Sequence, residues 1–248
     1  HLHIIDPRFP LIPNQGYLPK PFTCRDYLDR LAGYPLAGGA VVSGSFQGFD
    51  QDYLCAALRE LGPGFVGVTQ LPATVSDARI LELDRSGVRA VRFNLKRGGS
   101  EDVSQLERMA QRVYELAGWH VELYVDAREL PALSATLSRL PAVSIDHLGL
   151  SKEGFPQLLA LVERGVRVKA TGFGRVDFDV REALATIHGI NPRALMFGTD
   201  LPSTRAPRPY RDEDISLLYE ALGDAGAAEV LYANAAAFYG RPVSRRRE

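Results

Sequence analysis

The chain has 248 residues, enough for one α/β barrel or two ordinary domains, and its 46% hydrophobic content supports a sizeable core. Its formal net charge of −1 shows no basic excess, which argues against binding to nucleic acid or to an anionic membrane. The two cysteines, Cys24 and Cys55, form no disulfide or metal-binding pattern, so we expect a reducing compartment such as the cytoplasm.

The ends of the chain give further expectations. No apolar run approaches the length of a membrane span, and the first residues do not resemble a leader peptide. The first residue is His1 rather than methionine, so we expect HLHIID to be the end of a first strand whose earlier part precedes this sequence. The basic segment RPVSRRRE (241–248) is expected to be a frayed end.

Short β-branched runs alternate with amphipathic segments along the chain. The runs expected to form strands are HLHIID (1–6), GGAVVSG (38–44), GFVGVTQ (64–70), VRAVRFN (88–94), HVELYV (120–125), AVSIDH (142–147), VRVKAT (166–171) and ALMFGTD (194–200). Helices are expected at 24–33, 51–61, 77–87 and 127–140, because capping residues precede them at Thr23, Asp50, Ser76 and Asp126.

This order predicts eight strand–helix units, and eight such units in about 250 residues are typical of a TIM barrel. No change of composition divides the chain, so we expect one (β/α)8 domain over residues 1–248. The alternative is an open doubly wound sheet. No G-x-G-x-x-G motif follows any strand, which weakens the dinucleotide-binding version of that fold.

In a TIM barrel the chemistry lies where the strands end. Three of the five histidines and one carboxylate fall at such positions, and so do several cations. The strand-end candidates are His1, His3, Arg92, Arg97, Tyr124, His147, Arg175 and Asp200. His120 and His188 lie instead at a strand start and within a helix. Only four of the 29 basic residues are lysines, so an arginine by itself is weak evidence of function.

Each candidate has a functional and a structural interpretation. Asp200 could be a general base or the cap of a following helix, and the nearby Pro202 favours the base. His147 shares strand parity with Ile145 and Val143, which predicts an inward side chain at the rim, with Asp146 pointing the other way. Because the strand parity of Arg92 is that of an inward residue, it would need an anion as partner.

Glu122 and Lys169 are expected inside the barrel as a structural ion pair. Their strand parity allows both side chains to point inward.

Six motifs carry a resemblance to a known family. HLHIID, VRFNLKR, GWHVELYVDARELPAL, SIDHLG, VKATGFGR and FGTDLP, in this order, resemble the amidohydrolase superfamily, and most closely its branch of 2-pyrone-4,6-dicarboxylate lactonases. The resemblance implies a distorted (β/α)8 barrel that hydrolyses a cyclic ester, an activity of aromatic catabolism.

The resemblance also implies roles for individual residues. It implies that Asp200 activates water and that His1, His3 and His147 polarise the lactone carbonyl. It further implies substrate-binding roles for Arg92, Arg97, Tyr124, Arg175, Tyr17 and Ser45. Two motifs depart from the family pattern: Leu150 replaces an arginine after SIDH, and TDLPS places Leu201 and Ser203 where the family commonly has tryptophan and histidine.

The sequence leaves more than one alternative for the metal requirement and for the exact activity. We expect no metal to be required, because no further histidine ends the fifth or seventh strand. The alternative is one zinc ion held by His1, His3, His147 and Asp200, as in a zinc-dependent decarboxylase of the same superfamily. A third possibility is a non-enzymatic barrel that binds a small acid. The expected partner is a small carboxylated molecule, and a homodimer is possible.

Overall fold

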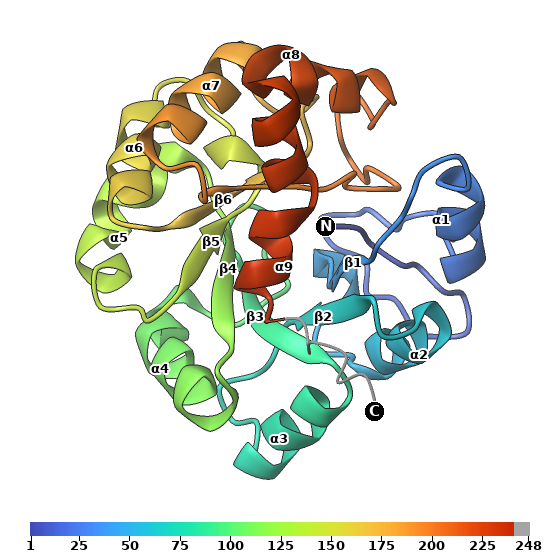
Figure 1. Ribbon diagram of the computed structural model, residues 1–248. Helices are drawn as coiled ribbons and strands as arrows, with labels where there is room; N and C mark the ends of the chain where they lie inside the picture. The colour runs from blue at the N-terminus through green and yellow to red at the C-terminus, as the bar shows by residue number, and fades with distance from the viewer. Residues whose placement is uncertain (241–248) are drawn as a thin grey trace, which may run out of the picture.

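The computed structural model describes residues 1–240, so the expected basic end at 241–248 lies outside the described residues. The described chain is built around one parallel sheet that curls on itself, with helices on its outer face (Figure 1). The seven strands are hydrogen-bonded in sequence order: β1 (Gly39–Val42), β2 (Phe65–Thr69), β3 (Val88–Asn94), β4 (His120–Tyr124), β5 (Val143–Ile145), β6 (Arg167–Ala170) and β7 (Leu195–Phe197). This is an α/β fold of the TIM-barrel type.

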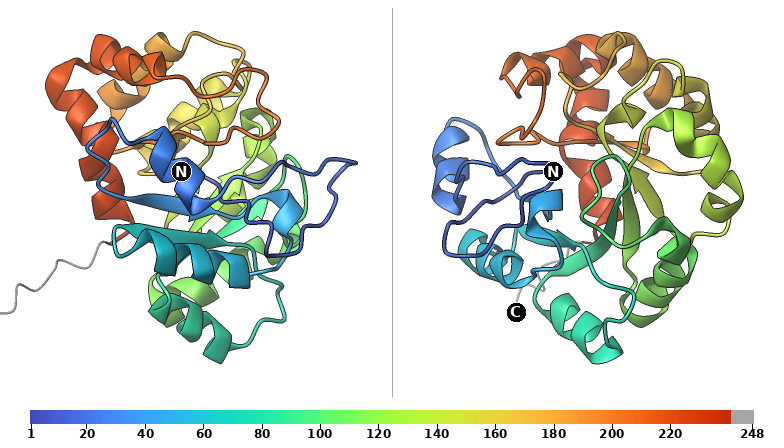
Figure 2. Two further views of the ribbon diagram at one scale, coloured as in Figure 1. Left: turned by 90° about the vertical axis from the view of Figure 1, so that its right-hand side faces the viewer. Right: turned by 180° about the vertical axis from the view of Figure 1, so that it is seen from behind.

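The helices alternate with the strands. They are α1 (Cys24–Arg30), α2 (Asp52–Leu61), α3 (Asp77–Arg85), α4 (Leu106–Ala117), α5 (Leu130–Leu137), α6 (Phe155–Glu163), α7 (Val180–Ile190), α8 (Glu213–Ala228) and α9 (Asn234–Phe238). The left view of Figure 2 shows the C-terminal helices on one side of the sheet and the long N-terminal loop on the opposite side. No helix within residues 1–240 has the length and apolar character needed to cross a membrane.

The capping residues start the helices much as the sequence predicts. Thr23 forms a capping box with Asp26 ahead of α1, and the Ser76 side chain accepts from Arg79 N ahead of α3. Asp126 caps a short 3₁₀ turn that leads into α5 rather than α5 itself. The prediction for Asp50 is off by one residue, because Gln51 is the N-cap of α2 and Asp50 binds the Asp52 N–H.

The expected end of a first strand is present as a short extended segment, so the described residues contain seven hydrogen-bonded strands and this segment. Leu2 forms a parallel bridge with Val41 of β1. On the other side, His3 N donates to Leu201 O at 2.8 Å, just beyond β7. His1–His3 thus lies between the two edge strands, where it closes the rim.

Beside the segment His1–His3, between β1 and β7, is a cavity of about 540 Å³ with a largely apolar lining that includes Ala40, Val66 and Met196.

Strand parity divides the interior from the helix-facing core. Ala40, Val42, Val66, Val68, Ala90 and Met196 form a small apolar cluster, whereas the larger core packs against the helices. Arg92 and Glu122 are in register on neighbouring strands, and Glu122 is in register with Ser144. Polar side chains therefore form a layer in the barrel between that apolar cluster and the rim.

Candidate active site

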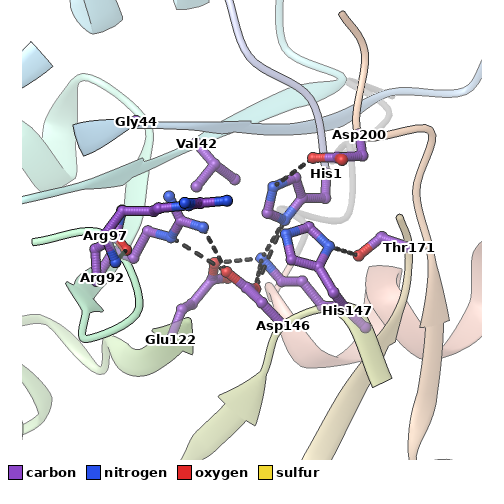
Figure 3. A network of polar contacts seen from close by, with 12 residues as sticks. His1, Val42, Gly44, Arg92, Arg97, Glu122, Asp146, His147, Thr171 and Asp200 are labelled. Atoms are coloured by element: carbon purple, nitrogen blue, oxygen red, sulfur yellow. Dashed lines mark hydrogen bonds and ion pairs between the residues drawn. The ribbon is translucent and has the colours of Figure 1, made fainter. Parts of the chain in front are cut away.

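Two histidines and one aspartate meet at the rim where the first segment closes the barrel. Figure 3 shows His1 beside Asp200. His1 Nε2 lies 3.3 Å from His3 Nε2. Asp200 Oδ1 lies 3.6 Å from His1 Nε2 and 3.4 Å from His3 Nε2. All three side chains are buried. The structure thus brings the first expected strand end (1–3) and the last one (200) into one small polar volume, as the position of these residues at strand ends predicts.

His147 reaches the same volume by a different route from the one that the sequence predicts. Val143 and Ile145 pack in the helix-facing core, so the parity argument for His147 is wrong, and it is Asp146 that points into the barrel. The strand ends at Ile145, and His147 then takes a positive φ of 52°. This left-handed turn brings its ring to within 5.2 Å of the His1 ring, centroid to centroid.

Tight local packing fixes the His147 ring. His147 Nδ1 and Thr171 Oγ1 are hydrogen-bonded at 2.7 Å. Burial lowers the pKa of His147 to about 3, so the ring is neutral at neutral pH. Gly172 follows Thr171 with a φ of +60°, a conformation that favours glycine, and a Cβ at this position would lie 2.8 Å from His147 Nδ1 and 2.7 Å from Arg175 Cδ.

Arg175 holds Asp200 in its ionised form. Its Nε and Nη2 lie 2.8 and 2.7 Å from Asp200 Oδ2, and Nη2 also donates to Thr204 O. Burial alone would raise the pKa of the Asp200 carboxyl, but the Arg175 charge and the neighbouring His147 and His3 together outweigh burial and hold that pKa well below its usual range. Asp200 Oδ1 is buried and has no hydrogen-bond partner within the described chain. It is therefore the oxygen that is free to accept a proton.

A layer of buried charges lies directly below the rim. Arg92 Nη2 donates to Asp146 Oδ2 at 2.6 Å, and Arg92 Nη1 donates to Ser43 O at 2.8 Å. Lys169 is paired with Glu122, which confirms the predicted ion pair, and its Nζ lies 3.4 Å from Asp146 Oδ1. Burial would raise the pKa of both carboxyl groups, but the neighbouring cations outweigh it and lower both values. Two cations and two carboxylates thus balance each other.

Glu122 has further partners that the sequence did not indicate. His120 Nε2 lies 3.1 Å from Glu122 Oε1, and the Tyr239 hydroxyl donates to the same oxygen. Tyr239 directly follows α9, so the C-terminal helix closes the end of the barrel opposite the rim.

The remaining predicted residues surround a small cavity of about 30 Å³ at the rim. Its lining includes His3, Ser45, Arg92, Arg97, Tyr124, His147, Arg175 and Arg205. Tyr17 is not part of this lining, but its ring lies 4.3 Å beneath the Arg205 guanidinium. The structure therefore gathers nearly all the predicted substrate-binding residues around one cavity and places Tyr17 at its margin.

Arg205 was not among the predicted site residues. It lines the cavity together with Arg97, so two cations lie close together there. The acceptors of Arg205 are neutral, namely the side chains of Asn14 and Gln15 and the backbone carbonyl of Asn14. Burial and the nearby Arg97 charge both lower the pKa of Arg205. The departures from the family pattern lie close by: Leu150 is buried, and the Ser203 hydroxyl accepts from Tyr210 N. Arg208, by contrast, is paired with Asp214.

Within residues 1–240, two groups of side chains have the spacing that could hold a metal ion. One is His1, His3 and Asp200, and the other is His1, Asp146 and His147. Lys169 Nζ lies 3.1 Å from His1 Nδ1 and 3.4 Å from Asp146 Oδ1. An ammonium group therefore already occupies the cation position of the second group.

Comparison with known proteins places this geometry in a family. The model of the amidohydrolase family matches residues 1–241. A curated 2-pyrone-4,6-dicarboxylate hydrolase from Comamonas testosteroni is 31% identical over 160 residues, which are 60% of this chain. The chain spans about half the length of that curated relative.

Solved structures agree on the fold. A Pseudomonas putida protein named as a 2-pyrone-4,6-dicarboxylic acid hydrolase has a TM-score of 0.80 and 29% identity, covering 98% of this chain and 97% of that one. An Acinetobacter baumannii protein with the same kind of name, solved with citric acid bound, has a TM-score of 0.83 at 21% identity, covering 97% of each chain. On the family match over nearly its whole length, this chain belongs to the amidohydrolase family.

Proposed function

We propose that this chain is a lactonase that opens a small carboxylated cyclic ester with a water molecule activated by Asp200. The observation that carries the proposal is the ionised Asp200 carboxylate, whose free Oδ1 faces the two imidazoles of His1 and His3. Histidine rings for a carbonyl and cations for a carboxylate line one small cavity, and the proposed base Asp200 is paired with Arg175 of that lining. Ester hydrolysis needs these three components. The curated relative is named for the hydrolysis of such a lactone.

The proposed reaction takes place in two steps. Asp200 Oδ1 removes a proton from water while the water oxygen attacks the lactone carbonyl carbon, which forms a tetrahedral intermediate with a negative oxygen. The ring C–O bond then breaks as the carbonyl re-forms, and the departing oxygen takes the proton from Asp200. The products are a carboxylic acid, ionised at neutral pH, and a hydroxyl group on the same open chain. An N–H group from the rim histidines stabilises the negative oxygen.

The cations around the cavity indicate that the proposed substrate carries a negative charge. Arg97 and Arg205 face the mouth, and the acceptors of Arg205 are neutral, so a substrate carboxylate would supply their missing countercharge. Arg175 would share its guanidinium between that carboxylate and Asp200. Arg92 already binds Asp146 and Ser43 O, so it would contact substrate only through its remaining N–H groups. Tyr124, Ser45 and Tyr17 are proposed as neutral contacts.

We further propose that no metal is required, and that the protein acts in a reducing compartment such as the cytoplasm. The position of Lys169 within one candidate metal group supports the first proposal. The free cysteines Cys24 and Cys55 are consistent with the second.

A panel of carboxylated lactones tests the proposed function. The release of protons measures the rate of ring opening. With ¹⁸O-labelled water, one labelled oxygen atom should appear in the new carboxylate of the product. Because Leu150 is apolar and buried, we expect 2-pyrone-4,6-dicarboxylate to be hydrolysed poorly and a ring with less charge or an alkyl substituent to be preferred. Release of CO₂ from a carboxylated ring, without uptake of label, would show a decarboxylase instead.

A further inference from the structure

Lys169 lies in the buried polar layer directly below His1. Its Nζ is paired with Glu122 Oε2 and lies 3.1 Å from His1 Nδ1 and 3.4 Å from Asp146 Oδ1. An ammonium group has three N–H donors and no acceptor; Lys169 forms hydrogen bonds with Glu122 and His1, and Asp146 lies within ion-pair distance. His1 Nδ1 must then be the acceptor of the Lys169 hydrogen bond.

The distances disfavour the opposite arrangement. If His1 carried its proton on Nδ1, the acceptor for that proton would be Asp146 Oδ1, which lies 3.7 Å away. This separation is too long for a hydrogen bond, whereas the 3.1 Å contact with Lys169 is within range. Glu122 and Asp146 both lie beside Lys169 as its ion-pair partners.

A backbone carbonyl oxygen indicates which ring nitrogen of His3 carries a proton. His3 Nδ1 lies 2.7 Å from Val42 O, and a carbonyl oxygen only accepts, so His3 Nδ1 carries a proton. In a neutral His3 ring, Nε2 then has a free lone pair. His1 Nε2 and His3 Nε2 are 3.3 Å apart, which fits one proton between them.

We propose that Lys169, held by Glu122, is a positioning residue that fixes His1 in the tautomer with its proton on Nε2, so that His1 is the donor and His3 the acceptor of the rim pair. The two histidines of H-x-H therefore have different roles. In the proposed lactonase reaction, on which this catalytic part rests, His1 supplies the N–H that stabilises the negative oxygen.

The same arrangement does not fit a metal ion in either candidate group. A protonated Nε2 has no lone pair, so His1 cannot be a ligand together with His3 and Asp200. The group of His1, Asp146 and His147 contains the Lys169 ammonium. Lys169 thus turns a metal-like set of side chains into a hydrogen-bonding pair.

Histidine tautomers can be measured directly in the wild-type protein. Long-range ¹H–¹⁵N spectra of the ¹⁵N-histidine-labelled chain distinguish a protonated Nδ1 from a protonated Nε2, and the His1 signals are those missing from His1→Gln. We expect Nε2–H for His1 and Nδ1–H for His3. A protonated Nδ1 on neutral His1 would overturn the proposal, and this measurement needs no altered Lys169.

Zinc binding supplies a second test that does not depend on any lactone. Lys169→Met alone would leave the Glu122 charge buried without its cation, so the variant is Glu122→Gln/Lys169→Met, which removes both charges together. The exposed Lys152→Met is the control. Outer partners of metal-binding histidines typically change affinity about 10–100-fold. We expect zinc, measured by calorimetry, to bind the double variant at least about tenfold more tightly than the wild type or the control.

The results also separate this inference from the proposed function. Unchanged zinc affinity in the folded double variant would overturn the inference, whatever the lactonase assay shows. If the tautomers and zinc affinities are as expected but no lactone is opened, the positioning role of Lys169 stands and the proposed reaction fails.

Discussion

Replacing Arg175 by methionine tests how the site controls its proposed base. Arg175 Nε donates to Asp200 Oδ2 at 2.8 Å, its Nη2 lies 2.7 Å from the same oxygen, and the two side chains are only 6% and 1% exposed. Solvent therefore screens this pair little. Removing one partner of a buried ion pair typically costs ~3–5 kcal/mol, because the other charge is left uncompensated. We expect the free energy of unfolding of Arg175→Met to fall by about that amount near neutral pH.

The pH dependence of this loss has a definite sign. In the wild type the pKa of Asp200 lies below its value in the unfolded chain, so the carboxylate stabilises the fold above about pH 4 and loses this effect as the pH falls through the folded pKa. In Arg175→Met burial remains, and burial raises the pKa of Asp200. A buried carboxyl with a raised pKa destabilises most at neutral pH and least in acid. The difference from wild type should therefore shrink as the pH is lowered.

Urea denaturation near neutral pH and at about pH 5 measures this difference. The matched control is Arg205→Met, which removes a guanidinium from the same cavity but none from Asp200. The control should lose little stability at either pH. A loss in Arg175→Met that is below about 1 kcal/mol, or equal at both pH values, would refute the ion-pair reasoning. The acidic limb of the pH–rate profile of Arg175→Met should also move toward neutrality.

Three further predictions concern the site. Activity should survive exhaustive chelation and should not rise with added Zn²⁺ or Mn²⁺; activity lost on chelation and restored by zinc would contradict this. Arg205→Met should raise KM for a dicarboxylate lactone roughly tenfold or more, as loss of a charged hydrogen bond worth ~1.5–3 kcal/mol implies, and should change KM for a monocarboxylate less. Gly172→Ala should keep the fold but lower kcat, because its Cβ would meet Arg175 and His147 at 2.7 and 2.8 Å; a kcat equal to wild type would show that the rim tolerates the shift.

The strands and the rim could be predicted from the sequence because both follow local rules. Seven of the eight expected β-branched runs form β1–β7. Each run is long enough for a buried strand and is separated from the next by a helical segment. Strand ends of a parallel sheet meet at one edge, so His1, His3 and Asp200 could be placed together without knowing any distance. The interior ion pair of Glu122 and Lys169 followed from parity in the same way.

The parts that could not be predicted depend on register and on turns. Strand parity assigned His147 to the interior, but the strand ends at Ile145 and a residue with positive φ reverses the direction of the next side chains. The partner of Arg92 is Asp146, 54 residues away, and only the register of β3, β4 and β5 brings them together. Arg205 lies on a loop after β7 that has no periodicity, so its place at the cavity had no sequence signal.

The central claim is that Asp200 is the base, and Asp200→Asn tests it most directly, because asparagine keeps the shape and removes the proton acceptor. With an accepted lactone, we expect kcat to fall at least about a hundredfold while near-ultraviolet circular dichroism remains that of the folded protein. Asp126→Asn is the control, since Asp126 is another buried carboxylate that follows β4 and is paired with Arg128 and Lys96. Near-wild-type turnover in folded Asp200→Asn would contradict the account.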